Sequence, residues 1–283
     1  MYIVNELEQY KILDAGDGLK LESWNGIILS RPDPQVIWKK EHEEYWHSAS
    51  AEYIRSNKGG GEWQINKRIP DEWTIEELDL RFKVKPTGFK HMGLFPEQAF
   101  NWRFIMDNLE EGDNFLNLFA YTGGASVAAA KAGAKVTHVD ASKGIVQWAK
   151  ENAELSDIPG DRIRYIVDDC MKFVQREYRR GKRYEAIIMD PPSYGRGTNK
   201  ELWKLEDTIE DLITECTRIL SDDAKFLILN SYTTGLSNIV TANLLKKHLW
   251  NRNGTVESDD LAIPIEDSDL YLPCGSTARW IGC

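Results

Sequence analysis

Short apolar runs alternate with longer segments of helical pattern through most of the chain after residue 113. Five of these runs predict buried strands, at residues 115–119, 135–139, 164–167, 184–189 and 225–229. The run at 184–189 is almost continuously apolar, which is typical of a central parallel strand. The segments between the runs predict helices, at residues 125–132, 141–155, 171–180 and 212–220. Strands that alternate with helices predict an α/β domain with a parallel sheet.

The first 85 residues follow another pattern, in which polar and apolar positions alternate around tight turns. Residues 14–18, with the sequence DAGDG, separate an apolar pair from the alternating segment 19–24, and Asn25-Gly26 begins a second turn. This pattern is typical of short antiparallel strands. Pro86-Thr87-Gly88 marks a boundary. We therefore expect a small β-rich accessory domain at residues 1–85, with a role in substrate recognition, and a larger domain at residues 86–283.

The first strand of the larger domain leads into a turn with two glycines, Gly123 and Gly124, and the second strand ends in Asp140. Glycines allow a ligand to approach the backbone closely, and a carboxylate in this place can accept both hydroxyls of a ribose. The turn lacks the GxGxxG spacing of a dinucleotide site. The unit therefore predicts a cofactor that carries a nucleoside, with an ordinary strand–helix–strand unit as the alternative.

The same turn resembles motif I of the class I S-adenosylmethionine (SAM) methyltransferases, in the variant N-x-F-x-Y-T-G-G. This variant is similar to that of the bacterial ribosomal RNA methyltransferases that act on cytosine C5 or guanine N7 of the large subunit. The resemblance covers residues 89–283 and implies a Rossmann-like, seven-stranded sheet that binds SAM. It places these residues at the cofactor: Phe95, Gln98, Asn117, Phe119, Ala120, Tyr121, Thr122, Gly123, Gly124, Asp140, Ala141, Ser142, Asp168, Asp169, Cys170 and Asp190.

Two segments outside the turn strengthen this resemblance. Residues 93–98 are similar to the G-x-F-x-[DE]-Q segment of the group, which implies that Phe95 and Gln98 lie beside the methionine end of SAM. Taken alone, the segment predicts a turn followed by a helix at residues 97–109. After the third strand, Asp169 aligns best with the acid that accepts a hydrogen bond from the adenine amine. Asp168 is the alternative for that role, or the N-cap of the following helix.

The fourth strand runs into Asp190-Pro191-Pro192-Ser193-Tyr194. Ligands of open α/β sheets bind beyond the carboxyl ends of the strands. The two prolines stiffen the loop and remove two donors, which leaves a row of acceptors. The loop resembles the [DNS]-P-P-[YFW] motif of nucleic-acid amino-methyltransferases, with Ser193 inserted as in the guanine-N7 group. The resemblance implies catalytic roles for Asp190, Pro191, Pro192 and Tyr194, with Tyr194 stacking on a flipped base.

The cysteines argue against a cytosine-C5 target, because that reaction requires a thiolate that adds to the base. In the C5 relatives the thiol lies after the fifth strand, in S-C-S-G-L. Aligned on Gly235-Leu236, this chain has Thr233 at that position, and Cys170, Cys216 and Cys274 lie elsewhere. A nitrogen target such as guanine N7 or an exocyclic amine needs mainly positioning of the reactants. No cysteine or histidine spacing indicates a metal site.

The charge of the chain does not identify the molecule that accepts the methyl group. The net charge of −10 argues mildly against strong nonspecific binding of nucleic acid, and residues 1–85 carry 12 basic and 16 acidic side chains. Three local features favour RNA contact: the alternating cations at 81–85, the basic segment 176–183, and Trp63 beside a loop at 58–61 that we expect to be mobile. Each feature has an ordinary structural alternative. The cations at 81–85 can form a solvated strand face, those at 176–183 can complement a helix dipole, and Trp63 can be a core residue.

The sequence thus predicts a SAM-dependent enzyme that acts on ribosomal RNA. It shows no signal peptide or membrane-length apolar run, which indicates a cytoplasmic protein without a membrane partner, and it leaves the oligomeric state open. A small-molecule or protein methyltransferase is the first alternative, because the chain is acidic. A SAM- or RNA-binding module without turnover is the second. By the resemblance, residues 237–250 are a helix and residues 261–264 and 269–280 a closing antiparallel pair, from which Arg279-Trp280 would reach the active face.

Overall fold

The computed structural model describes residues 1–56, 60–196, 202–233 and 236–283. The chain forms two compact units. The α/β unit consists of Met1, Asn101–Leu261 and Gly275–Cys283, and the N-terminal unit consists of Tyr2–Phe100 and Ala262–Cys274. Among the described residues, no helix has the length and apolar character to cross a membrane.

This division differs from the expected boundary at residue 85. Residues 86–92 remain packed in the N-terminal unit: the Trp63 indole donates to the Thr87 carbonyl over 2.9 Å, and the Lys85 amide donates to the Met92 carbonyl over 3.0 Å. The segment 262–274 joins the same unit through a hydrogen bond of 2.8 Å from the Glu266 amide to the Ile12 carbonyl. Except for the Lys85–Met92 bond, these contacts join residues 24 or more positions apart, so the local pattern did not reveal them.

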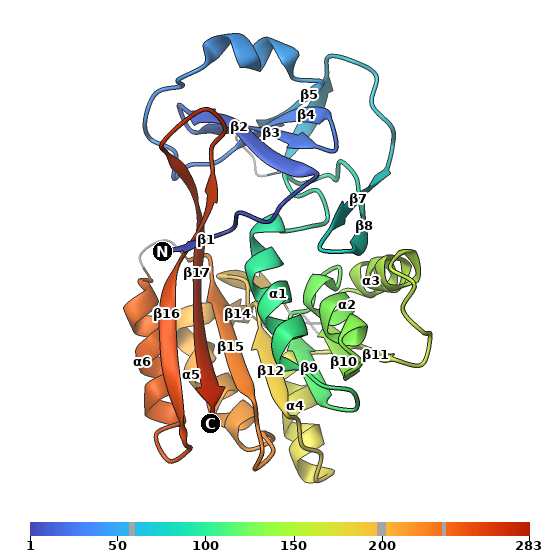
Figure 1. Cartoon of the computed structure of the whole chain (residues 1–283), viewed down its shortest axis with the longest axis vertical. Coiled ribbons are helices and arrows are strands. Elements are labelled where there is room, and N and C mark those ends of the chain that lie inside the picture. The colour runs from blue at the N-terminus through green and yellow to red at the C-terminus, as the bar shows by residue number, and fades with distance from the viewer. Residues whose placement is uncertain (57–59, 197–201, 234–235) are drawn as a thin grey trace. The chain divides into compact units, whose positions relative to one another are not determined.

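The α/β unit is built on a twisted sheet in the order β16-β17-β15-β12-β9-β10-β11 (Figure 1). Neighbouring strands from β15 to β11 are parallel, and β17 pairs with β15 in the antiparallel sense. Their bounds are β9 Asn114–Leu118, β10 Lys135–Asp140, β11 Ile163–Val167, β12 Ala186–Met189, β15 Phe226–Ser231, β16 Gly254–Pro264 and β17 Tyr271–Gly282. The short β1 (Tyr2–Ile3) precedes β16 in this order, and the Val4 amide donates to the Ala262 carbonyl. The Rossmann-like α/β class with a seven-stranded sheet is confirmed.

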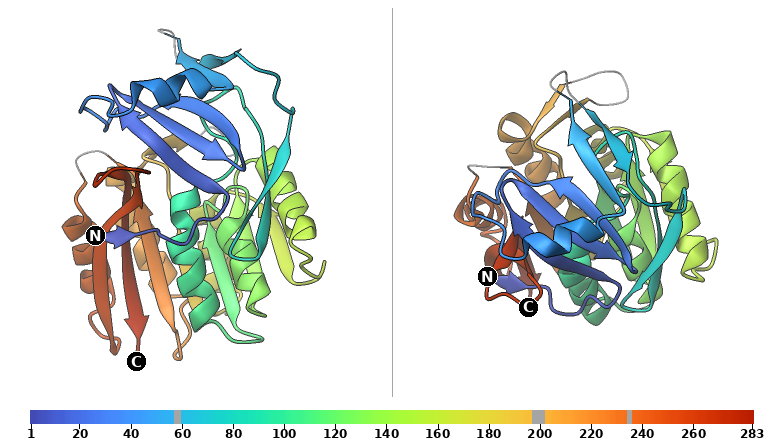
Figure 2. Two further views of the ribbon diagram at one scale, coloured as in Figure 1. Left: turned by 45° about the horizontal axis from the view of Figure 1, so that its top comes forward. Right: turned by 90° about the horizontal axis from the view of Figure 1, so that it is seen from above.

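Helices cover both faces of this sheet (Figure 2). They are α1 Ala99–Asn108, preceded by the 3₁₀ turn η2 Pro96–Gln98, then α2 Gly124–Lys131, α3 Lys143–Leu155, α4 Cys170–Arg179, α5 Leu205–Thr217 and α6 Asn238–His248. Side chains of β9, β12 and β15 that include Leu116, Ile187 and Leu227 form one buried cluster with residues of α4, α5 and α6. The expected helix at 212–220 is instead α5, which begins at Leu205 and ends at Thr217, because residues 206–211, polar except for Ile209, form its first turns.

The N-terminal unit is β-rich, as expected. Five strands form a sheet in chain order: β2 Tyr10–Gly16, β3 Leu19–Trp24, β4 Ile27–Pro32, β5 Ala51–Arg55 and β6 Gly61–Ile65. The 3₁₀ helix η1 (Glu43–Ser48) lies between β4 and β5, and β7 (Trp73–Glu77) pairs with β8 (Leu80–Val84). The turns at Asp17-Gly18 and Asn25-Gly26 have positive φ at both residues, as type I′ hairpins require. The first turn is shorter than expected, since β2 continues to Gly16.

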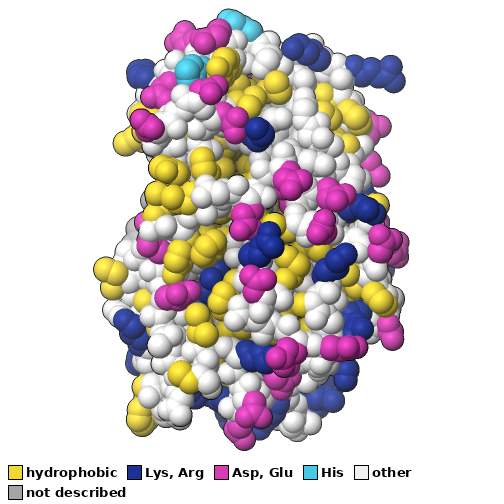
Figure 3. Space-filling view, in the orientation of Figure 1, with side chains coloured by type: hydrophobic (Ala, Val, Ile, Leu, Met, Phe, Trp, Pro, Cys, Tyr) yellow, Lys and Arg dark blue, Asp and Glu magenta, His cyan; other side chains and the backbone are white. Residues whose placement is uncertain are grey.

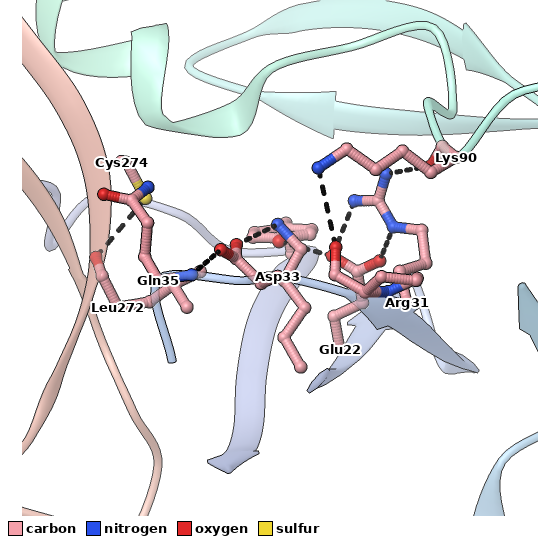
Figure 4. Close-up of polar contacts among 10 residues, drawn as sticks. Glu22, Arg31, Asp33, Gln35, Lys90, Leu272 and Cys274 are labelled. Carbon is pink, nitrogen blue, oxygen red and sulfur yellow. Dashed lines mark hydrogen bonds and ion pairs between the residues drawn. The ribbon is translucent and has the colours of Figure 1, made fainter. Parts of the chain in front are cut away.

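A buried ion pair between Glu22 of β3 and Arg31 of β4 holds this unit together (Figure 4). Arg31 donates to Glu22 through Nε and, over 2.8 Å, through Nη2, and the Tyr10 hydroxyl donates to Glu22 over 2.6 Å. Arg31 also donates to the Lys90 carbonyl over 2.6 Å. Burial alone would raise the pKa of Glu22, but the cations Arg31 and Lys20 outweigh it and hold this pKa at about 2. One guanidinium therefore ties two strands to the segment 86–92.

Most tryptophans of this unit serve as packing residues. Trp24 is fully buried, and Trp38, Trp46, Trp63 and Trp73 are partly buried. Trp63 lies edge-on to Tyr53 with ring centroids 5.4 Å apart, in addition to its hydrogen bond to Thr87. Stacking of Trp63 on RNA stays a prediction. Residues 57–59, which include the first half of the expected mobile loop at 58–61, lie outside the described part of the chain.

Candidate active site

Four elements that carry the expected site residues end side by side at one edge of the sheet. Asp140 is the last residue of β10, Asp168 follows β11, Asp190 follows β12, and the glycine turn follows β9. Because these strands are parallel neighbours in the order β12-β9-β10-β11, their carboxyl ends share one edge. The structure thus brings together the four chain segments that the sequence singled out.

The backbone of the glycine turn is unusual even where it carries side chains. Phe119 and Tyr121 have φ angles of 54° and 49°, in the left-handed region that few residues other than glycine adopt. Gly123 also has a positive φ, 86°. At Gly124, a Cβ atom would lie 2.6 Å from the Trp102 ring. The two glycines therefore satisfy different needs, backbone conformation at Gly123 and close packing at Gly124.

Asp140 braces the turn from the neighbouring strand. Its Oδ2 accepts a hydrogen bond of 3.0 Å from the Tyr121 amide, and its Oδ1 accepts one of 2.9 Å from the Ser142 amide. Burial raises the pKa of Asp140, and the two amide hydrogen bonds oppose this shift. A carboxylate oxygen can accept two hydrogen bonds, so both oxygens retain capacity for a ligand's hydroxyl groups.

Asn117 lies on β9, the strand that leads into the glycine turn, and its buried side chain points into the interior. Its side-chain amide donates to Ser126 Oγ over 2.9 Å, and Ser126 Oγ lies 3.0 Å from Nδ1 of His138. All three side chains are buried, and burial lowers the pKa of His138 to about 3. The sequence analysis missed Ser126 and His138. The available signal was a pair of polar residues, Asn117 and His138, on two strands otherwise read as apolar, and β9 and β10 place them opposite each other.

At the end of β11 the expected roles of the two acids need one correction. Asp169 is the N-cap of α4, because its Oδ1 accepts a hydrogen bond of 2.9 Å from the Lys172 amide. The N-cap role considered for Asp168 is wrong, since the chain turns into the helix one residue later. Asp168 accepts from the Asp169 amide over 2.8 Å and forms an ion pair with Arg176. The contact of Asp169 with the adenine amine stays a prediction.

Cys170 also contributes to the turn. Its buried Sγ accepts a hydrogen bond of 3.3 Å from the Phe119 amide. Burial raises the pKa of the Cys170 thiol well above its ordinary value, with the Phe119 amide opposing the shift. The thiol is therefore a neutral acceptor that fixes the start of the glycine turn.

Several hydrogen bonds fix the loop that follows β12. The Asp190 amide donates to the Leu118 carbonyl over 3.3 Å, and the Ser193 carbonyl accepts from the Leu205 amide over 3.0 Å. The hydroxyls of Ser193 and Thr233 are 2.7 Å apart. Tyr194, by contrast, is 61% exposed. The loop thus combines a fixed backbone with one accessible aromatic ring.

Trp203, which the sequence analysis missed, links this loop to the glycine turn. Its indole nitrogen donates to the Pro192 carbonyl over 2.6 Å, and its ring lies 4.8 Å from that of Phe119. Trp203 belongs to β14 (Leu202–Lys204), which pairs with β13 (Tyr194–Arg196). Residues 197–201 between these strands lie outside the described part of the chain. Two three-residue strands are too short to produce a periodic pattern, so Trp203 could not be singled out from the sequence.

Three other expected positions differ from the central group. Phe95 and Gln98 belong to the N-terminal unit, where Gln98 is buried and the Phe95 ring lies 5.3 Å from that of His91, so their contact with SAM stays a prediction. Arg279 does not extend to the active face. It is buried in β17, where its guanidinium donates to Asn101 Oδ1 over 2.7 Å. Gly235, on which the comparison with the C5 relatives was aligned, lies outside the described part of the chain. Across the described residues, no group of side chains has the arrangement of a metal site.

Comparisons with known proteins agree with this architecture. Residues 51–231 match the family model of S-adenosylmethionine-dependent methyltransferases. The chain is 34% identical over 249 residues to ribosomal RNA large subunit methyltransferase K/L of Pseudoalteromonas translucida. The aligned region covers 80% of this chain and 35% of that protein. It is 29% identical over 218 residues to ribosomal RNA large subunit methyltransferase K of Neisseria meningitidis, covering 74% of this chain and 61% of that one. The chain thus spans less than two thirds of the length of these curated relatives.

A solved structure extends the match to the whole chain. The crystal structure of a SAM-dependent methyltransferase from Agrobacterium tumefaciens has 35% sequence identity and a TM-score of 0.95, and the superposition covers 100% of this chain and 93% of that one. The family match, the fold and the carboxyl-edge site lead to the same conclusion. This chain belongs to the S-adenosylmethionine-dependent methyltransferases.

Proposed function

We propose that this protein transfers the methyl group of SAM to a nitrogen atom of a ribosomal RNA base, guanine N7 or an exocyclic amine. The names of the relatives above support ribosomal RNA as the substrate class. The choice of nitrogen rests on one observation: the carboxyl edge lacks a reactive thiol, because Thr233 stands at the aligned position and Cys170, which does lie at this edge, is buried and neutral.

The residues at this edge fit SAM by their chemistry. SAM presents hydrogen-bond donors at its ribose hydroxyls, its adenine amine and its ammonium group. The carboxyl edge offers carboxylates after successive strands, at Asp140, Asp168, Asp169 and Asp190. Asp140 would accept from the ribose hydroxyls and Asp169 from the adenine amine. When bound, SAM supplies an activated methyl group on its sulfonium sulfur.

The four thiols are unsuited to attack on a base. Cys170 and Cys216 are buried, and burial raises the pKa of both. Cys274 is buried in the N-terminal unit, with its pKa raised in the same way. Cys283 follows the end of β17, at the opposite edge of the sheet, because β17 is antiparallel to β15. Thr233 stands at the aligned position, and its hydroxyl lies 2.7 Å from that of Ser193. A covalent C5 mechanism has no nucleophile among these groups.

The Asp190 loop suits a nitrogen acceptor. Pro191 and Pro192 lack amide hydrogens, so the loop offers acceptors to an N–H group of the substrate base. The exposed Tyr194 ring provides a surface for stacking of a base taken out of its helix. Since the nucleophilic nitrogen brings its own lone pair, the protein's contribution is to hold donor and acceptor in line.

The test is methylation of ribosomal RNA from cells that lack the gene. The full chain is incubated with labelled SAM and this RNA, and the product is digested to nucleosides and analysed by mass spectrometry. A new methylguanosine or N-methylated base, absent with Asp190→Ala, is the expected result. A 5-methylcytidine product would refute the nitrogen target. Labelling of small molecules or proteins from the same cells, with unlabelled RNA, would favour the alternative that the acidic net charge suits.

A further inference from the structure

A pocket opens at the other edge of the sheet, beside the amino ends of β9, β10, β11 and β12. Its volume is about 240 Å³, and its lining includes Asn114, Lys135 and Tyr184. The lining reaches Thr137, and parallel strands rise about 3.3 Å per residue, so the three residues on to Asp140 separate the pocket from the carboxyl edge by roughly 10 Å. The pocket is therefore distinct from the proposed methyl-transfer site.

Cations outnumber anions in the lining of this pocket. Five of its side chains are basic: Lys135, Arg162, Arg164, Lys182 and Arg183. Two are acidic, Asp161 and Glu177. On the face shown in Figure 3, acidic and basic groups are interspersed. In a chain with a net charge of −10, this local excess of positive charge requires an explanation.

Glu177 offsets only part of the excess, because its carboxylate is shared between one lining cation, Arg164, and groups outside the count. It is fully buried and accepts a hydrogen bond of 2.7 Å from the Tyr184 hydroxyl. It also pairs with Arg164 at 3.4 Å and with Arg180 at 3.0 Å. Arg180 lies outside the lining, so Glu177 is shared with a cation beyond the pocket.

The remaining cations keep their charge available. Within the part of the chain that the structure describes, Lys135, Lys182 and Arg183 have no carboxylate within ion-pair distance. The guanidinium of Arg162 donates to the Gly133 carbonyl over 2.6 Å, and that of Arg183 donates to the Lys182 carbonyl over 2.8 Å. Neutral carbonyls orient these groups without cancelling their charge. Like charges gathered in this way repel each other until an anion binds.

We propose that this pocket binds a phosphate group. Arginine forks and lysine ammonium groups are the side chains that proteins use for phosphate, and both line this pocket. Its volume equals that of several water molecules at about 30 Å³ each, which leaves room for a tetrahedral anion. The phosphate can belong to an RNA backbone or to a free phosphate compound, and the same residues would hold either.

Charge reversal tests the proposal in the full-length protein. The double variant Lys135→Glu/Lys182→Glu changes two exposed lining residues. The control Lys131→Glu/Arg179→Glu makes the same net change at exposed positions outside the lining. Surface substitutions of this kind usually alter stability by less than about 0.5 kcal/mol, so both variants should fold. The affinity for SAM, measured by calorimetry, should be equal in both.

Two probes distinguish the sources of phosphate. Binding of pyrophosphate is measured by calorimetry, and binding of a labelled single-stranded RNA by fluorescence anisotropy at several salt concentrations. If RNA supplies the phosphate, the lining variant binds it more weakly, and the slope of log K against log salt falls by roughly 1.4, since each lost phosphate contact contributes about 0.7. If a free phosphate compound is the ligand, the lining variant loses pyrophosphate binding and keeps its RNA binding. In both cases the control resembles the wild type. Equal behaviour of the two double variants toward both probes would overturn the proposal.

Discussion

The indole nitrogen of Trp203 donates a 2.6 Å hydrogen bond to the carbonyl oxygen of Pro192. The same ring packs against Phe119 at the start of the glycine turn. One side chain thus joins the segment expected to hold the methyl donor to the segment expected to hold the acceptor base. A fixed distance between these segments is what in-line transfer requires, because small displacements of the reactants are costly in rate.

Replacing Trp203 by phenylalanine should slow the chemical step. Trp203→Phe keeps an aromatic ring beside Phe119 and removes the donor to Pro192, so we expect kcat to fall about 10-fold while SAM affinity changes less than about 3-fold. Kinetics with the RNA substrate and calorimetry with SAM measure the two effects. Trp250→Phe is the matched control, because Trp250 is 82% exposed and should tolerate the change. An equal loss of SAM affinity would show that Trp203 supports only the cofactor.

Asp190 and Asp140 should have separable roles. We expect Asp190→Ala to reduce methyl transfer by roughly 100-fold or more with SAM affinity largely retained, since on the proposed function its carboxylate accepts from the substrate base. Asp140→Ala should instead weaken SAM binding by roughly 10- to 100-fold, because hydrogen bonds to a charged group contribute about 1.5–3 kcal/mol each. Calorimetry and single-turnover assays separate binding from transfer. Equal loss of SAM affinity in both variants would show that the Asp190 loop has been misassigned.

The Glu22–Arg31 pair should make stability depend on acidity. The pKa of Glu22 in the folded state is about 2, below its ordinary value of 4.5, so its contribution is complete above about pH 4.5 and is lost as the pH falls toward 2. Glu22→Gln should lower the free energy of unfolding by about 3–5 kcal/mol at pH 7, because it leaves Arg31 buried without its partner. The variant should also lose less stability than the wild type between pH 4.5 and pH 2.

Urea unfolding at several pH values tests this expectation. Glu62→Gln provides the control in the same unit, because Glu62 is exposed and should have little effect. Identical pH profiles for wild type and Glu22→Gln would contradict the assigned role.

Gly124 should be required for packing against Trp102. A Cβ atom at Gly124 would lie 2.6 Å from the indole ring, so Gly124→Ala should cost about 1–3 kcal/mol of stability. Gly144→Ala is the matched control, because nothing lies within 4 Å of its added Cβ and the residue is helical, so it should stabilise the protein by up to about 1 kcal/mol. Combining Gly124→Ala with the smaller Trp102→Leu should give less than the sum of the two losses in thermal unfolding.

The sequence by itself determined the α/β class, its five central parallel strands, the glycine turn and the acids that follow successive strands. These features are local. A buried parallel strand must be apolar along its length, and a ligand edge must carry polar residues where such strands stop. Asp140, Asp190 and Gly123 could therefore be found without coordinates.

Only the tertiary structure decided which residues support that edge. Trp203, His138 and the Glu22–Arg31 pair act through partners distant in the chain or on neighbouring strands, and residues 262–274 return to the N-terminal unit. The basic segment 176–183 shows the same limit: Arg176 and Arg180 are paired, whereas Lys182 and Arg183 line a pocket. A charge in a sequence becomes available or neutralised only when folding selects its neighbours, since electrostatic interaction depends on distance and burial.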